Sequence, residues 1–347
     1  MTEHSNNIFL SDGKLLTQEA KLNVLSCFDG MSCLHIALDK LGMRVNKYFA
    51  SEIDKYAMQV TQANYPNTIQ VGNVEFVTKA MLNNEIHLLA GGSPCQGFSF
   101  AGKQLNFEDP RSKLFFEFVR LKNELKPKYF LLENVRMKKE SQDVISKYLG
   151  VEPIMINSNL VSAQNRVRFY WTNIPNLTLP ADKNILLKDV LENENEIVGA
   201  RRGRYLVDGI RQDGKMLTAG KTKQYLEIRN DEKSNCLTTV QKDNIVIRDK
   251  SKCVRSGGRG SYDRHEWDSV DKNHTRKLTI LECERLQTLP DNYTKHVSNS
   301  QRYKMIGNGW TVDVITHILK GLSEKKEGKK KNIVTDDMHE TLIKTET

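Results

Sequence analysis

Residues 22–32 read LNVLSCFDGMS, an apolar run of strand length that leads into a turn at Phe28-Asp29-Gly30. Apolar residues then recur at helical spacing from Ser32 to Leu41, so the stretch predicts a strand, a glycine turn and a helix. A glycine lets the backbone approach a ligand closely, and the start of a helix presents free N–H groups. The stretch therefore predicts one unit of an α/β sheet with a ligand-binding loop at the carboxyl end of the strand.

The same alternation of strand and helix continues through the first half of the chain. Further apolar runs occupy Val45–Ala50, Ile86–Ala90 and Tyr129–Leu132, and helical spacing occupies Asp54–Asn64 and Ser112–Leu125. Repetition of this kind predicts a mostly parallel sheet that helices cover on both faces. Ligands of such sheets bind at the carboxyl ends of the strands, where we expect the chemistry.

After Pro175 the composition changes. From Lys188 to Asn273 the chain is polar and rich in Arg, Lys, Gly and Thr, which predicts a smaller domain of short strands and loops. Helical periodicity returns at Leu278–Gln287 and Thr311–Leu322, so we expect the last helices to rejoin the larger domain. The predicted boundaries are 1–187 and 274–322 for the larger domain, 188–273 for the smaller one and 323–347 for a basic tail.

Composition limits the possible classes of protein. The net charge of +9 permits binding to a polyanion, although part of it comes from lysines at 325–331, which we interpret first as a solvated tail and second as a nucleic-acid contact. No run of eighteen apolar residues predicts a membrane helix, and the polar first residues do not match a signal peptide. The six scattered cysteines form no C-x-x-C pair and the histidines no H-E-x-x-H pattern. We therefore expect a cytoplasmic protein without a metal site or membrane association.

Two polar residues after later strands extend the predicted binding loop. Glu52 ends the next apolar run about twenty residues after the glycine turn, which is the spacing of a carboxylate that binds ribose hydroxyls. Asn73 follows the candidate strand Thr68–Val71. Together they predict a pocket for a cofactor that contains adenosine. The spacing leaves a dinucleotide and S-adenosylmethionine equally open.

Cys95 lies in the segment GGSPCQGFS at residues 91–99, at the predicted carboxyl end of a strand. A lone cysteine is more often a small buried hydrophobe, but a loop of Gly and Pro favours an accessible nucleophile. Glu133 ends a neighbouring apolar run and is predicted at the same edge of the sheet. Arg166 and Arg168 alternate, which predicts one face of a strand, although two arginines alone are equally typical of a solvated face.

These residues carry a family resemblance, which covers residues 21–321. The chain resembles the cytosine-5 DNA methyltransferases, most closely the bacterial and bacteriophage members. The resemblance rests on motifs in the family's order, namely Phe28-Asp29-Gly30, Glu52, Pro94-Cys95-Gln96, Glu133-Asn134-Val135, Gln164-Asn165-Arg166-Val167-Arg168 and Gly307-Asn308-Gly309-Trp310-Thr311-Val312. Ser32 stands where the family often has a second glycine, and Asn73 where it usually has Asp. We expect the small Ser32 to keep the turn and the Asn73 oxygen to accept from the adenine amino group.

The resemblance implies a Rossmann-like methyltransferase fold with S-adenosylmethionine as the cofactor. It implies that Cys95 adds to carbon 6 of a cytosine flipped out of duplex DNA, while Glu133 binds ring nitrogen 3. Arg168 would contact the base oxygen, and Arg166 a phosphate or the nucleophile loop. The cofactor would contact Phe28, Asp29, Gly30, Met31, Ser32, Glu52, Ile53, Asn73, Val74, Pro94, Leu114, Asn308 and Trp310.

The resemblance also places a target-recognition domain at residues 188–273. Candidate DNA contacts are Gln96, Ser99, Arg202, Arg204, Thr238, Thr239 and Arg259. The expected partner is double-stranded DNA bound by a monomer, with modification or self-protection of bacterial or phage DNA as the role. Three alternatives stay open: a transfer RNA substrate, a catalytically silent DNA-binding protein, and a nicotinamide dehydrogenase that would explain only Gly30 and Glu52.

Overall fold

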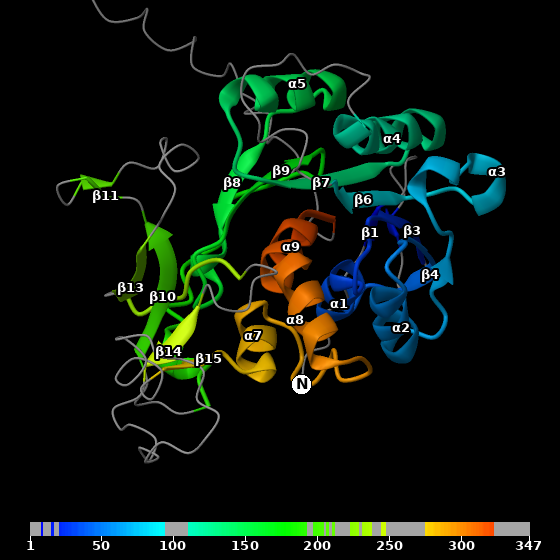
Figure 1. Ribbon diagram of the computed structural model, residues 1–347. Helices are drawn as coiled ribbons and strands as arrows, with labels where there is room; N and C mark the ends of the chain where they lie inside the picture. Colours follow the sequence, from blue (N-terminus) through cyan, green and yellow to red (C-terminus); the bar gives the residue numbers. More distant parts are fainter. Residues whose placement is uncertain are drawn as a thin grey trace, which may run out of the picture.

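A seven-stranded sheet forms the centre of the protein in the computed structural model (Figure 1). The structure describes residues 8–9, 15–16, 21–93, 110–192, 197–204, 206–207, 210–211, 223–228, 231–237, 244–247 and 275–322. The strand order is β5-β4-β3-β6-β7-β9-β8. The strands are β3 (Leu22–Cys27), β4 (Val45–Ser51), β5 (Ile69–Gln70), β6 (Leu88–Gly92), β7 (Tyr129–Val135), β8 (Ile154–Asn157) and β9 (Val167–Thr172).

The five strands from β5 to β7 pair in parallel, whereas β9 pairs antiparallel with both β7 and β8. The expected mostly parallel sheet is confirmed. The chain reverses its direction of winding between β3 and β6, because β4 and β5 extend the sheet on one side and β6 begins the other. Ligands of open α/β sheets bind at such a point.

Helices cover both faces of this sheet (Figure 1). All six residues of β3 are buried, and they alternate between two hydrophobic clusters. Val24 packs in one cluster with residues of α1, α2, α7, α8 and α9, and Leu25 packs in the other with residues of α3, α4 and α5. The helices are α1 (Cys33–Lys40), α2 (Lys55–Asn64), α3 (Lys79–Leu82), α4 (Pro110–Leu125), α5 (Lys139–Leu149), α7 (Ile280–Leu286), α8 (Asn299–Asn308) and α9 (Val312–Leu319). The short 3₁₀ helices are η1 (Val74–Phe76), η3 (Ser158–Leu160), η4 (Leu187–Asp189) and η6 (Lys320–Leu322).

A smaller antiparallel sheet lies to one side of the central one, with the order β13-β10-β14-β15 (Figure 1). Its strands are β10 (Ile197–Arg204), β13 (Lys223–Ile228), β14 (Ile245–Ile247) and β15 (Thr275–Lys277), and two separate ribbons pair β11 (Leu206–Val207) with β12 (Ile210–Arg211) and β1 (Ile8–Phe9) with β2 (Leu15–Leu16). The sheet spans 197–277, and the predicted domain boundaries stay a prediction. Val246 of β14 belongs to the same hydrophobic cluster as Leu187, Val190 and Leu191, so the smaller sheet packs against the larger core.

The C-terminal helices return to the larger core. Helix α9 packs against α1, and Tyr293 donates its hydroxyl proton to the carbonyl of Met31 at 2.7 Å. This return places residues 307–310, at the end of α8 and just after it, beside the loops that follow β3 and β6. Within the described residues, no helix is long and apolar enough to cross a membrane.

Candidate active site

A cavity of about 480 Å³ lies at the carboxyl ends of β3, β4, β6 and β7, where the sheet reverses its winding. Most of the residues expected to contact the cofactor line it, namely Phe28, Asp29, Gly30, Glu52, Ile53, Asn73, Val74, Leu114, Asn308 and Trp310. Met31 and Ser32, which follow Gly30 at the start of α1, do not line the cavity, because they are buried with 1% and 0% of their surface exposed. Pro94 lies outside the described residues.

The loop after β3 has a strained conformation that two carboxylates support. Phe28, Gly30 and Ser32 have φ of 56°, 60° and 61°, a region that only glycine enters without cost. Glu52 accepts hydrogen bonds from the backbone N–H of Gly30 at 2.7 Å and of Ile53 at 2.7 Å. Glu52 also accepts from the N–H of Asp54 at 2.8 Å, and because a carboxylate offers about four acceptor sites, one site is left for a ligand hydroxyl.

Asp29 supports the loop from below. It accepts hydrogen bonds from the hydroxyl of Tyr48 at 2.6 Å and from that of Ser32. Burial raises the pKa of Asp29 to about 6 although both hydroxyls favour the charged form. Asp29 therefore links the glycine loop to β4 and to the start of α1.

The cavity walls suit a nucleoside. Ile53 lines the cavity and is 76% exposed, so a flat apolar ring could cover it. Phe28 and Leu114 add apolar surface, and Glu52 provides the acidic end. The volume lies within the range of about 300–1,000 Å³ for small-molecule sites. The residues present therefore fit a cofactor that contains adenosine.

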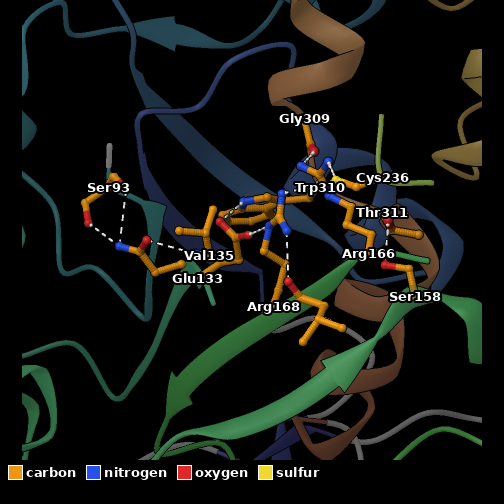
Figure 2. A network of polar contacts seen from close by, with 12 residues as sticks. Ser93, Glu133, Val135, Ser158, Arg166, Arg168, Cys236, Gly309, Trp310 and Thr311 are labelled. Carbon is orange, nitrogen blue, oxygen red and sulfur yellow. Dashed lines mark hydrogen bonds and ion pairs between the residues drawn. The ribbon is translucent and has the colours of Figure 1, made fainter. Parts of the chain in front are cut away.

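Glu133 on β7 lines the same cavity and is 8% exposed (Figure 2). Its Oε1 forms an ion pair with Nε of Arg168 at 2.9 Å, and its Oε2 accepts from Nε1 of Trp310 at 3.1 Å. The register explains the ion pair, since Glu133 lies opposite Tyr170 and Arg168 opposite Val135, which puts both on one face of the β7–β9 pair. Burial lowers the pKa of the Arg168 guanidinium, but Glu133, Cys236 and Tyr170 together outweigh burial, so the pKa lies above its ordinary value.

Arg166 lies just before β9 and is 3% exposed. It donates to the carbonyl of Gly309 at 2.9 Å, to that of Leu237 at 3.0 Å and to that of Gly307 at 3.3 Å (Figure 2). Burial, and then the neighbouring Arg168, lower the pKa of its guanidinium. Backbone carbonyls thus accept from both terminal nitrogens of the guanidinium. The nucleophile loop lies outside the described residues, so the expected contact with it or with a phosphate stays a prediction. Arg166 joins the C-terminal motif to the segment that leads into the smaller sheet.

Cys236 also belongs to the site, although no pattern in the sequence distinguishes it from the other cysteines. Its sulfur lies 3.2 Å from Nη1 of Arg166 and 3.7 Å from Nη2 of Arg168 (Figure 2). A parallel bridge between Gln164 and Ser234 holds the segment against the arginine motif. The stretch 234–237 therefore contacts the arginine motif of the larger domain.

The other described cysteines are poor nucleophiles. Cys27, Cys33 and Cys283 are buried, and burial raises the pKa of each thiol, to about 12 for Cys33 and Cys283 and higher for Cys27. A thiol must ionise before it attacks. Cys236, which is half-buried, is the remaining cysteine in the part of the chain that the structure describes.

Several predicted residues fall outside the described ranges, namely Cys95, Gln96, Ser99, Thr238, Thr239 and Arg259. Arg202 and Arg204 lie on β10, for which only the backbone is described. Ser93 precedes Cys95 by two residues and lines the cavity, and its hydroxyl accepts from the amide of Asn134 at 3.2 Å. Across the described ranges, no three His, Cys, Asp or Glu side chains form a group that could hold a metal ion.

Comparison with known families identifies the scaffold. The model of the C-5 cytosine-specific DNA methylase family matches residues 22–324. The chain belongs to this family. Members of the family use S-adenosylmethionine as methyl donor, which resolves the choice of cofactor that the spacing of Gly30 and Glu52 left open and excludes the dehydrogenase alternative.

This methylase is similar to type II methyltransferases over nearly its full length. M.HpaII of Haemophilus parainfluenzae is 29% identical, with 88% of this chain and 90% of the relative covered. M.HhaI of Haemophilus parahaemolyticus is 27% identical, with 86% and 93% covered. The methyltransferase EhMeth of Entamoeba histolytica has a TM-score of 0.61 at 18% identity (88% and 98% covered), and a DNMT2 mutant of Spodoptera frugiperda has 0.61 at 19% (88% and 100% covered). At these identities the solved structures support the fold, and the expected Rossmann-like class is confirmed.

Proposed function

We propose that this methylase transfers a methyl group to carbon 5 of a flipped-out cytosine in a specific duplex DNA sequence. The observation that carries the proposal is the buried Glu133–Arg168 ion pair, because it lies in the same cavity as the acidic and apolar residues that suit the cofactor. Modification of bacterial or phage DNA inside a bacterial cell is the corresponding role, which the similarity to type II methyltransferases supports.

In this proposal the cofactor occupies the end of the cavity beneath β3 and β4. Glu52 accepts from a ribose hydroxyl, Phe28 and Ile53 pack on its adenine ring, and the bound cofactor supplies an electrophilic methyl group. Glu133, on β7, lines the same cavity.

Carbon 5 of cytosine is a weak nucleophile, so the ring must first be activated. The thiolate of Cys95 forms a bond to carbon 6, and the electrons of the 5,6 double bond become available at carbon 5. Glu133 donates a proton to ring nitrogen 3, which neutralises the charge that develops there, while Arg168 holds the carboxyl group and contacts the base oxygen. After methyl transfer carbon 5 releases its proton to solvent, the bond from sulfur to carbon 6 breaks as the double bond re-forms, and nitrogen 3 returns its proton to Glu133.

The proposed partner is double-stranded DNA. A cytosine inside a duplex does not reach a cavity at the edge of a sheet, so the base must be flipped out of the stack. The net charge of +9 favours contact with phosphates. The smaller sheet at residues 197–277 follows the arginine motif and contains Arg202 and Arg204, which we assign to DNA recognition.

Transfer of labelled methyl groups to duplex DNA, compared with total transfer RNA, tests the proposal. We expect label in DNA cytosine, none after Cys95→Ser, and measurable transfer by the matched variant Cys236→Ser, which keeps a hydrogen-bond acceptor beside the arginines. Label in RNA alone would refute the DNA substrate. DNA binding without any transfer would favour the catalytically silent alternative. Bisulfite sequencing of host DNA after expression then identifies the recognised sequence.

A further inference from the structure

We propose that Trp310 is a positioning residue for Glu133, and that its indole links the cofactor end of the cavity to the carboxylate that receives the cytosine. The inference rests on the function proposed above and adds a role for Trp310 besides contact with the cofactor. It follows from the hydrogen bond between Nε1 of Trp310 and Oε2 of Glu133.

The two carboxylate oxygens of Glu133 have different donors. Arg168 holds Oε1 at 2.9 Å and Trp310 holds Oε2 at 3.1 Å (Figure 2). One donor alone would allow the carboxylate to rotate about its last bond, whereas two donors fix its plane. Each oxygen keeps a second site, and a proton carried there can be donated to nitrogen 3 of a base that enters the cavity.

Gly92 at the end of β6 leaves room for this hydrogen bond. A Cβ at this position would lie 2.9 Å from Oε2 of Glu133 and 2.9 Å from Nε1 of Trp310. Such separations are too short for non-bonded carbon, so any side chain here would displace one of the two groups. Strand β6 therefore packs directly against the Glu133–Trp310 contact.

The backbone that carries Trp310 is also held in place. Arg166 and Nε2 of Gln287 both donate to the carbonyl of Gly309, at 2.9 Å and 3.2 Å. Arg166 lies two residues before Arg168. The segment 166–168 therefore supplies one donor to Glu133, the Arg168 guanidinium, and holds the other, Trp310, through the hydrogen bond from Arg166 to the carbonyl of Gly309. Since Trp310 also lines the cavity, a cofactor that packs on the indole acts on the same side chain that orients Glu133.

The variant Trp310→Phe keeps an aromatic ring but removes the N–H donor, together with part of the ring volume, which the control below also loses. A hydrogen bond to a charged group contributes enough that its loss should slow single-turnover methyl transfer roughly ten- to a hundredfold at saturating cofactor. The affinity for S-adenosylmethionine, measured by equilibrium dialysis, should fall far less than the rate. We expect Gly92→Ala to slow transfer in the same way, although it leaves the indole unchanged.

Trp171→Phe is the matched control. Nε1 of Trp171 donates to the hydroxyl of Ser146 at 3.0 Å, and the ring is fully buried in the hydrophobic cluster on the other side of the sheet. This variant also loses a buried indole hydrogen bond, so it should lower stability. The transfer rate per folded molecule should stay at the wild-type value.

The indole N–H resonances of Trp310 and Trp171 give a readout that does not depend on turnover. In protein with ¹⁵N-labelled tryptophan, the two variants assign these signals. Glu133→Gln replaces a charged acceptor with a neutral one, so we expect it to shift the Trp310 signal and leave the Trp171 signal in place. An unmoved Trp310 signal, or a wild-type single-turnover rate in Trp310→Phe, would overturn the inference. A wild type that methylates no cytosine would instead refute the proposed function.

Discussion

Replacement of Arg166 by Met should destabilise the whole protein, and not only weaken binding of a substrate. Methionine has a similar length but no donor, so the carbonyls of Gly307, Gly309 and Leu237 would lose their charged partner in a site where the side chain is 3% exposed. Methionine can still fill the space, which limits the effect of a cavity.

The size of the effect follows from these carbonyls. A buried acceptor without a donor costs about 1–3 kcal/mol, and hydrogen bonds to a charged group are at the upper end of the usual scale. The three losses are not additive, because Gln287 still donates to the carbonyl of Gly309 at 3.2 Å, because the loop at 307–309 can relax and because the buried charge is also removed. We therefore expect the free energy of unfolding to fall by about 3–5 kcal/mol.

Urea denaturation of the wild type and of Arg166→Met measures this loss. Arg285→Met is a suitable control, since its pair with Asp291 at 2.8 Å is one-third exposed and should contribute less than about 1 kcal/mol. A loss below about 1 kcal/mol for Arg166→Met, together with weaker DNA binding, would refute the reasoning. That result would mean that the guanidinium serves DNA phosphates, as the family resemblance implied.

Three further predictions follow from the cavity and the strands beneath it. Burial raises the pKa of Asp29 to about 6, so between about pH 4 and 6 the folded protein keeps a proton that the unfolded chain releases. The free energy of unfolding should therefore fall by about 2–3 kcal/mol as the pH rises through this window. Urea titrations of Asp29→Asn should show no such fall. Ile53→Ala should reduce the affinity for the cofactor roughly tenfold without a change in stability, because the side chain is exposed until a ligand covers it. Met155 is also exposed but lies outside the cavity, so Met155→Ala should leave the affinity unchanged. Gly91→Ala would place a Cβ 2.9 Å from the carbonyl oxygen of Cys27 in the middle of the sheet, and calorimetry should report a loss of about 1–3 kcal/mol.

The central strands could be predicted from the sequence because they are buried on both faces. Strands β4 and β7 begin at the first residues of the predicted runs, Val45 and Tyr129, and extend one and three residues beyond their ends. Helix α8 gave no such signal, since it is mostly polar and buries only Met305, Ile306 and Gly307. The antiparallel direction of β9 is likewise invisible in its composition, because strand direction depends on the connections and not on the residues within the strand.

The candidate site likewise has features that the sequence predicted and features that depend on packing between distant segments. The order of the motifs and the strand ends predicted that Glu133 and Arg168 would lie at one edge, and the β7–β9 register brings them into contact. The hydrogen bond from Trp310 to Glu133 joins residues 177 positions apart, and it forms only because α8 and α9 pack back against the sheet. The position of Cys236 beside both arginines depends in turn on the docking of the segment after β13. No local pattern records such packing.

The most direct test of the account is the covalent trapping of the enzyme on duplex DNA that contains 5-fluorocytosine at its recognised site. The fluorine at carbon 5 is not released as the proton would be, so the bond from sulfur to carbon 6 persists after methyl transfer. We expect an adduct that forms only with S-adenosylmethionine present and that maps, by mass spectrometry of the digested complex, to the peptide containing Cys95. An adduct on Cys236, or bound DNA without any adduct, would contradict the account.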